Sequence, residues 1–469
     1  MSHPATALPA AAARAPAHTS AWTVFWLVSI AVFLVSLDST VLYAAFGTLR
    51  QAFPEASAAD MSWVLNAYTV VYAAALIPAG GLADAQGRKR VFLIGVALFL
   101  AASASCGLSG SVGGLIAARA LQAVGAALLT PASLSLVLEA FPKERRAIAV
   151  SLWGAVGGLA AAVGPSLGSL VVDGFGWSWA FYLNLPLGLI SLWRGVRLLP
   201  VVPKKGHTPP IDWVGMALLV ASVGLLALAI TQADSQAWSL LQKAASAGAG
   251  ALLLGVFVLW ARQARHPLVD LGLFRNPTYS SVNLATLAFG MAFAMMFFAF
   301  FSFMTQVWHY SLPQAGVAVT PGPLTVVPTA IVTGRLAARF GHRPFLVGGA
   351  LIYACSSLWL LLVPGPDPAY LSHWLPGLLL SGLGVGMVLP SLTGAAVSGL
   401  PASHYAVGSA VNQATRQIGS VMGVALTVLL IGHSGLVRGD FRPVYATHIA
   451  LALLTAVLCL RVNTGPRRH

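Results

Sequence analysis

The sequence predicts an all-α polytopic membrane protein, and three observations carry this prediction. Hydrophobic residues make up 58% of the 469 residues and charged residues only 8%, whereas a soluble domain has about 25% charged residues. The apolar stretches are continuous and about 20 residues long, as membrane-crossing helices require, and they lack the alternating polarity of a membrane β-barrel. The net charge of +14 fits basic cytoplasmic loops, so we expect a lipid bilayer as partner and no nucleic acid.

Fourteen candidate spans follow one another along the chain. Without the seventh and eighth spans, twelve would remain. The spans cover residues 22–46, 61–81, 91–109, 113–137, 147–172, 178–200, 212–231, 244–261, 278–305, 313–334, 345–363, 374–398, 405–432 and 444–461.

The basic residues predict how these spans are oriented. With a cytoplasmic N-terminus and alternating spans, 20 of the 26 Lys and Arg residues fall on the cytoplasmic side and four on the outer side. Such a bias is typical of cytoplasmic loops. We therefore expect an even number of spans with both termini in the cytoplasm. The high Ala and Gly content indicates a GC-rich bacterium, and hence the bacterial inner (cytoplasmic) membrane.

An internal repeat divides the chain. The stretch GGLADAQGRKR (80–90) follows the second span, and the similar TGRLAARFGHRP (333–344) follows the tenth. Two related halves are typical of secondary transporters, whose binding site lies between the halves. The predicted organisation is a disordered tail (1–20), a six-helix bundle (21–200), a linker with two extra helices (201–277), a second six-helix bundle (278–462) and a tail (463–469).

Five stretches resemble motifs of the major facilitator superfamily, and more narrowly of its 14-helix drug:proton antiporter family. The resemblance covers about residues 20–461 and implies the major facilitator fold, with two six-helix bundles and two extra central helices. The five stretches are LDST (37–40), GGLADAQGRKR (80–90), ARALQAVGAALLTPA (118–132), VGPSLGS (163–169) and WSWAFYLNLPLG (177–188).

Asp38 is the acid that lies deepest within a predicted span. A charged group near the centre of a bilayer costs roughly 2.5–3.5 kcal/mol on insertion scales, and burial among apolar neighbours disfavours its ionised form. Such a carboxyl can load and release a proton, although a purely structural, hydrogen-bonding acid remains the alternative. Arg119 lies well inside the fourth span and needs a partner, and Gln122 lies one turn along. The resemblance assigns Arg119 to proton coupling beside Asp38, and we expect Gln122 to share their hydrogen bonds. A clamp on backbone carbonyls is the structural alternative for Arg119.

A second group of residues is expected to gate the transporter. An acid and a base at helix ends can cap a neighbouring helix or bond its carbonyls, and a Gly-Pro pair lets helix backbones approach closely. The resemblance associates the Gly-Pro pair with export. The sequence departs from the family pattern at Ala338, which replaces the aspartate of the second loop copy. The gating residues are Asp84, Gly87, Arg88, Lys89, Gly164 and Pro165.

A third group is expected to bind substrate. The stretch 290–308 is dense in Met and Phe, and soft, reorientable side chains suit a pocket for many greasy ligands. Packing within the bundle or against lipid is the alternative for the Met and Phe side chains. For Arg416, on the thirteenth span, the alternatives are gating and tying helices together. The candidate residues are Tyr43, Phe293, Phe297, Phe300, Met304, Asn412 and Arg416.

The predicted function is proton-coupled export of hydrophobic or amphipathic drugs or metabolites, including cationic ones, by alternating access. No HExxH, Walker A or metal-spaced Cys/His pattern occurs in the sequence, so we expect no enzyme, no metal and no cofactor. The resemblance implies a monomer. A metabolite uptake symporter on the same fold and a non-transporting membrane sensor or scaffold are the two alternatives.

Overall fold

A computed structural model describes residues 20–142, 145–200, 210–232, 238–398, 400, 405–431 and 438–464. Over these ranges the chain is helical and contains no strand. Twelve helical segments in this part of the chain are long and apolar enough to cross a membrane, and they include the seventh and eighth predicted spans. The helix Ala58–Gln86 and the short helix Asn184–Leu198 are not among the twelve. The number fourteen therefore stays a prediction. Most of the two predicted tails lies outside the described residues.

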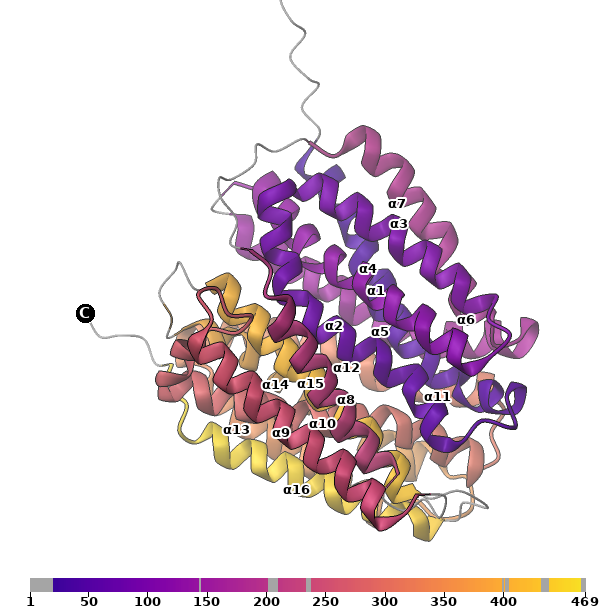
Figure 1. The fold of residues 1–469 in the computed structure, drawn as a ribbon. Coiled ribbons are helices and arrows are strands. Elements are labelled where there is room, and N and C mark those ends of the chain that lie inside the picture. The colour runs from indigo at the N-terminus through magenta and orange to yellow at the C-terminus, as the bar shows by residue number, and fades with distance from the viewer. Residues whose placement is uncertain are drawn as a thin grey trace, which may run out of the picture.

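The helices of the first half pack mainly on one another. The strongest pairings join α3 to α4, α2 to α4 and α1 to α5, while α7 lies against α1 and α3. Figure 1 shows these helices, coloured indigo to magenta, on one side of the molecule. They are α1 (Ala21–Ala52), α2 (Ala58–Gln86), α3 (Arg88–Gly107), α4 (Val112–Ala140), α5 (Arg146–Phe175), α6 (Trp179–Tyr182) and α7 (Asn184–Leu198).

The second half repeats this arrangement, and two further helices lie between the halves in the chain. α10 packs on α15, α13 on α14 and α16, and α12 on α14, while α8 pairs with α9 and also reaches α2 and α15 (Figure 1). The bounds are α8 (Trp213–Thr231), α9 (Leu240–Gln263), α10 (Pro277–Gln306), α11 (Leu312–Val319), α12 (Pro321–Phe340), α13 (Arg343–Leu362), α14 (Leu375–Ser398), α15 (Tyr405–Ile431) and α16 (Arg442–Cys459), with short turns at Leu271–Arg275, Tyr370–Trp374 and Arg438–Phe441.

Two predicted spans are broken in the structure. The span expected at 178–200 separates into α6 and α7 at Leu183, and the span expected at 313–334 separates into α11 and α12 at Thr320. Pro321 follows the second break at the first position of α12, where its missing N–H costs no hydrogen bond. α1 continues to Ala52, beyond the expected end at residue 46. Apolar periodicity locates a span but does not locate such breaks and ends.

The helix ends follow ordinary capping chemistry. Ser57 and Asp60 form a capping box at the start of α2, which satisfies two N–H groups that lack helical partners. At the other end of α2, Gly87 has φ +97° and joins α2 to α3, and Gly341 has φ +78° between α12 and α13. Both glycines adopt a backbone that other residues rarely adopt, so the repeated loop motif carries the same turn in each half.

The hydrophobic core is continuous between the halves at one end of the bundle. We call this the 1–2 loop end, because it carries the α1–α2 loop, and the opposite end, with Gly87, the 2–3 loop end. One core cluster runs from Val41 and Leu49 of α1 to Phe289 and Phe300 of α10. Phe46 of α1 also meets Phe298 of α10 there, with ring centroids 5.1 Å apart. A second cluster, toward the 2–3 loop end, consists of first-half residues alone.

Candidate functional site

The Asp38 carboxylate lies in the middle of α1 and is 2% exposed. Its Oδ2 accepts a hydrogen bond from Arg119 Nη1 at 2.6 Å. Its Oδ1 accepts from Gln122 Nε2 at 2.8 Å and from Asn184 Nδ2 at 2.9 Å. Arg119 and Gln122 come from α4 and Asn184 comes from α7, so one carboxylate joins three helices. A buried ion pair tolerates its loss of hydration only when further hydrogen bonds of this kind complete it.

The Arg119 guanidinium extends this network to a fourth helix. Its Nε donates to the backbone carbonyl of Val64 in α2 at 3.2 Å, and Nη1 also donates to Gln122 Oε1 at 2.7 Å. The guanidinium carbon lies 4.1 Å from the ring centroid of Tyr68, also in α2, a distance at which the ring face stabilises a cation. Arg119 therefore has acceptors besides Asp38.

Local structure explains how these side chains meet. Arg119 and Gln122 are three residues apart on one helix, so they share a face. Asn184 is the first residue of α7, directly after the break at Leu183, and its Nδ2 also donates to Ser103 Oγ of α3 at 3.0 Å. Ser103 in turn donates to the carbonyl of Phe181 at 2.8 Å. The break between α6 and α7 thus directs Asn184 toward Asp38.

The Gly164-Pro165 pair of α5 lies against the turn of α1 that follows Asp38. A Cβ at Gly164 would collide with the Thr40 hydroxyl, and one at Gly168 would lie 2.7 Å from the Val41 side chain. On its other side this part of α5 meets the second half. A Cβ at Gly316 in α11 would lie 2.6 Å from the Pro165 carbonyl oxygen. Close backbone approach, rather than hydrogen bonding by glycine, is the role of these small residues.

Ser166 adds hydrogen bonds to this contact between α5 and α11. Its hydroxyl donates to the Gly316 carbonyl at 3.2 Å and shares a short hydrogen bond with the Thr320 hydroxyl. Together with the Phe46–Phe298 ring contact, these interactions hold the two halves together at the 1–2 loop end.

The 2–3 loop end holds the basic residues of the loop motif. Arg88 pairs with Glu139 of α4 and donates to the Ser135 carbonyl at 3.4 Å. Lys89 Nζ donates to the Leu199 carbonyl, at the end of α7, at 2.6 Å. Each is a contact within the first half. The side chain of Asp84, the acid predicted to share this latch, lies outside the described residues.

The predicted substrate residues divide into two groups. Phe297, Phe300 and Met304 are buried in the packing of the second half, and Phe293 is half-buried with its ring 5.2 Å from that of Phe297. The structure therefore places these side chains within helix packing, and a binding role for them stays a prediction.

The polar substrate candidates lie on α15. Asn412 is buried and donates to Thr286 Oγ1 of α10 at 2.8 Å. Arg416 is half-buried, and its Nε donates to Gln413 Oε1 at 3.3 Å. Arg416 also interacts with Tyr72 of α2, so it lies where α2 and α15 bring the halves together. The side chain of Tyr43 lies outside the described residues.

Sequence reasoning missed two members of the Asp38 network. Asn184 and Ser103 are fully buried, and neither was a candidate. A signal existed for Asn184, because it stands in the quoted stretch WSWAFYLNLPLG as a polar residue within an apolar span. A polar residue in that position requires a buried partner. Glu139, the partner of Arg88, gave a weaker signal as an acid near the end of its span.

Solved structures and relatives identify the class. The fold matches that of an auto-inhibited peptide transporter of the POT family, with a TM-score of 0.65 and 18% identity over 95% of this chain and 98% of the other. This likeness shows the fold, a bundle of long apolar helices. The model described as Major Facilitator Superfamily matches residues 28–424 and 282–469. The chain belongs to the major facilitator superfamily, a family of transporters rather than enzymes.

The relatives in this superfamily include resistance and export proteins. An uncharacterised transporter of the same type from Mycobacterium tuberculosis is 35% identical over 86% of this chain and 69% of its own length. The tetracenomycin C resistance and export protein of Streptomyces glaucescens is 32% identical over 89% of this chain and 78% of its own length. Other bacterial relatives carry the names of multidrug and methylenomycin A resistance proteins.

Proposed function

We propose that this protein exports hydrophobic or amphipathic compounds from a bacterial cell in exchange for protons. The observation that carries the proposal is the buried Asp38 carboxylate, which Arg119, Gln122 and Asn184 hold in the middle of α1. Drug and antibiotic resistance transporters among the relatives support the export of such compounds. The proton gradient supplies the energy, so the cycle requires no bound cofactor.

In the proposed cycle, Asp38 takes up a proton and its ion pair with Arg119 is lost. Protonation removes the negative charge that Arg119 Nη1 contacts, and Arg119 keeps its bonds to Gln122 Oε1 and the Val64 carbonyl. These remaining acceptors matter because an arginine without partners in a dry interior is very costly. The site can therefore exist in two charge states.

Two contacts can transmit this change of charge to the second half. Arg119 holds the Val64 carbonyl of α2, and α2 packs along α15. Asp38 lies within one turn of Thr40, which packs on Gly164 of α5, and α5 in turn holds α11. Protonation of one carboxyl thus acts on two of the helix pairs that join the halves, α2 with α15 and α5 with α11. Coupling of this kind requires an element with two arrangements that both ligands influence.

The proposal includes an orientation. The 2–3 loop end faces the cytoplasm, because it collects the basic residues, and both termini lie there. The continuous core at the 1–2 loop end then closes the outer side, so this conformation is inward-facing. Arg88 and Lys89 form the first-half part of a cytoplasmic latch that closes in the outward-facing state. The halves at 21–200 and 278–462, the linker at 201–277 and a monomeric state belong to the same proposal.

The test follows the pH gradient of inverted vesicles that are energised to be acidic inside. Ethidium and benzalkonium are added, and the gradient is read from the quenching of a fluorescent amine. We expect at least one compound to dissipate the gradient with the wild type but not with Asp38→Asn. Asp173→Asn is the matched control, because Asp173 is exposed near the end of α5 and its loss removes the same charge.

Three other results would overturn parts of the proposal. If Asp38→Asn still exchanges protons for a transported compound, Asp38 is structural. If energised right-side-out vesicles accumulate the compound, the protein is an uptake symporter. If no compound moves and Asp38→Asn leaves a cellular phenotype of the gene intact, a sensor or scaffold is the better description.

A further inference from the structure

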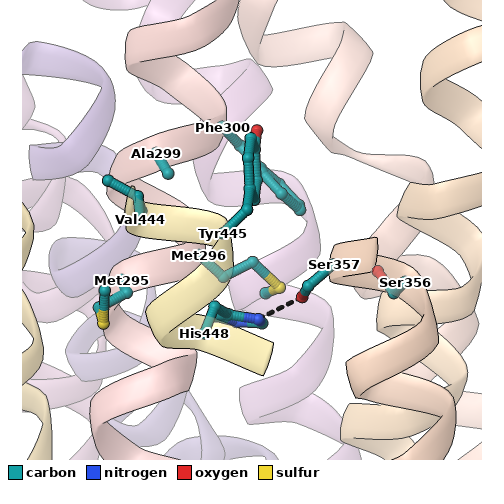
Figure 2. A pocket seen from close by; sticks show the side chains of 9 residues that line it. All are labelled: Met295, Met296, Ala299, Phe300, Ser356, Ser357, Val444, Tyr445 and His448. Carbon is teal, nitrogen blue, oxygen red and sulfur yellow. Dashed lines mark hydrogen bonds between the residues drawn. The ribbon is translucent and has the colours of Figure 1, made fainter. Parts of the chain in front are cut away.

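His448 lines a small cavity where α10, α13 and α16 meet. The cavity has a volume of ≈ 10 Å³, about what a single water needs on this measure. Figure 2 shows the imidazole hydrogen-bonded to the Ser357 hydroxyl beside the Met296 side chain. His448 is 4% exposed, and none of the predicted site residues except Phe300 touches this cavity.

The cavity lies at the second-half counterpart of the Asp38 network. Ser103 follows the left-handed Gly87 by the same number of residues as Ser357 follows the left-handed Gly341. Ser103 bonds Asn184 on the last helix of the first half, and Ser357 bonds His448 on the last helix of the second. The first, third and last helices of each half therefore meet at a buried serine.

The two counterparts differ in which residue can titrate. In the first half the titratable member is Asp38 on the first helix, and the last helix supplies a neutral asparagine. In the second half the first helix supplies Met295, Met296 and the Ala292 carbonyl, and the last helix supplies the titratable His448. Imidazole is the side chain whose ordinary pKa lies nearest neutral pH.

The surroundings of His448 can accommodate either charge state. Ser357 Oγ contacts His448 Nδ1 and also lies 3.2 Å from the Tyr353 carbonyl. With a neutral ring, the hydroxyl donates to Nδ1; with a charged ring, Nδ1–H donates to the hydroxyl, which donates to the Tyr353 carbonyl. The Tyr353 ring, with its centroid 4.5 Å from that of His448, presents a π-system to the cation. The Ser357 contact therefore serves both states without the movement of a heavy atom. Nε2 has no hydrogen-bond partner among the described residues, so the charged ring also needs a water molecule in the cavity.

We propose that His448 is a second proton-binding site, which alternates between neutral and charged forms during the transport cycle. The inference rests on the proposed proton-coupled function and adds a second proton carrier to Asp38. In this conformation an aromatic cluster that includes Phe303, Trp374 and Phe441 separates His448 from the 1–2 loop end. His448 exchanges its proton when the second half rearranges and water enters the cavity.

Among the titratable side chains around the cavity, only His448 has an ordinary pKa near neutral pH. Tyr353 on α13 and Tyr445 on α16 are the other titratable residues, and α10 contributes none to the cavity. The nine lining residues include no acid and no second base. A change of charge there as the pH falls below the ordinary histidine value of about 6.5 therefore reports His448.

The test measures the ring nitrogens of the full-length protein in lipid vesicles by solid-state NMR with ¹⁵N-labelled histidine. The chain has 11 histidines, and the His448 signal is identified as the one that is missing from the spectrum of His448→Asn. Asparagine is chosen because the counterpart residue of the first half is Asn184. We expect this signal to move to the imidazolium position as the pH falls below about 6.5. Ser357→Ala should lower the midpoint by roughly one pH unit, because the charged ring loses its stronger hydrogen bond.

The outcomes separate this inference from the proposed function. A His448 ring that stays neutral throughout the titration overturns the inference, even if Asp38-dependent export is observed. If His448→Asn does not fold, the single signal displaced by Ser357→Ala provides the assignment. In the vesicle assay, His448→Asn should lower the number of protons exchanged per compound; an unchanged number overturns the role in the cycle. A failure of export with Asp38 intact counts against the proposed function instead.

Discussion

Gly164 of α5 packs directly on Thr40 of α1, two residues after the buried Asp38. The Thr40 hydroxyl cannot turn away freely, because it bonds the carbonyls of Ser36 and Leu37, each at 3.1 Å. The contact therefore ties the position of α5 to the turn of α1 that carries the carboxylate.

Gly164→Ala should destabilise the protein and reduce transport, because the added Cβ collides with the Thr40 hydroxyl. Overpacking of this kind costs about 1–3 kcal/mol, measured as a lower free energy of unfolding of the purified protein. Gly174→Ala is the control on the same helix, since its Cβ meets no atom within 4 Å. Combining Gly164→Ala with Thr40→Ala should restore much of the loss. If Gly164→Ala behaves like Gly174→Ala, the close packing is not important.

Arg119→Ala should be more damaging than loss of the whole ion pair. Asp38 would remain buried without its cation, and breaking a buried pair costs about 3–5 kcal/mol. The double variant Asp38→Asn with Arg119→Ala removes both charges and should lose less stability than Asp38→Asn and Arg119→Ala combined. Thermal unfolding of the four proteins forms the cycle. Additive losses would show that the two side chains do not interact.

Cysteines at positions 166 and 320 should cross-link and stop transport. The hydroxyls of Ser166 and Thr320 are hydrogen-bonded between α5 and α11, so the replaced side chains lie within disulfide reach. Oxidation would fix the 1–2 loop end in its closed state, and reduction should restore activity. Ser166→Cys alone is the control, in a background with the exposed Cys355 changed to Ser. Full transport by the cross-linked protein would exclude opening at this end.

The stability of the protein should decrease as the pH falls below about 6.5, in part because of His342. This residue lies in the turn between α12 and α13, and burial lowers the pKa of its imidazole below the ordinary value of 6.5. The unfolded chain then binds a proton at a higher pH than the folded protein, so stability is full above the unfolded pKa and decreases toward the folded pKa. His342→Gln should flatten this part of the stability–pH curve, and an unchanged curve would assign the effect to other groups.

The charged residues of the site could be predicted from the sequence, but their neutral hydrogen-bond partners could not. The rarity of charge within a span identified Asp38 and Arg119, and the structure brings them together with Gln122. Asn184 and Ser103 are neutral, and neutral polar residues are common enough in membrane helices that none stands out without its neighbours. His448 escaped notice for the same reason, because only its contact with Ser357 distinguishes it.

The fold also has features that the sequence predicts and features that it does not. Apolar run length predicted where helices lie, and the structure has helices in all fourteen predicted regions. It could not predict the breaks at Leu183 and Thr320, because a turn inside an apolar run leaves hydropathy unchanged. One of these breaks directs Asn184 toward Asp38, so the feature that the sequence conceals is the one that shapes the site.

The continuous core at the 1–2 loop end has a consequence for the energy balance of a cell that makes this protein. Asp38 and Arg119 are each 2% exposed, and the Phe46–Phe298 contact lies between the halves on the side toward that end. Neither charged side chain can therefore exchange protons with bulk water until the helices around it rearrange. On the proposed mechanism, an idle copy in this conformation would not dissipate the proton gradient, so a cell could hold many copies in its membrane at little energetic expense.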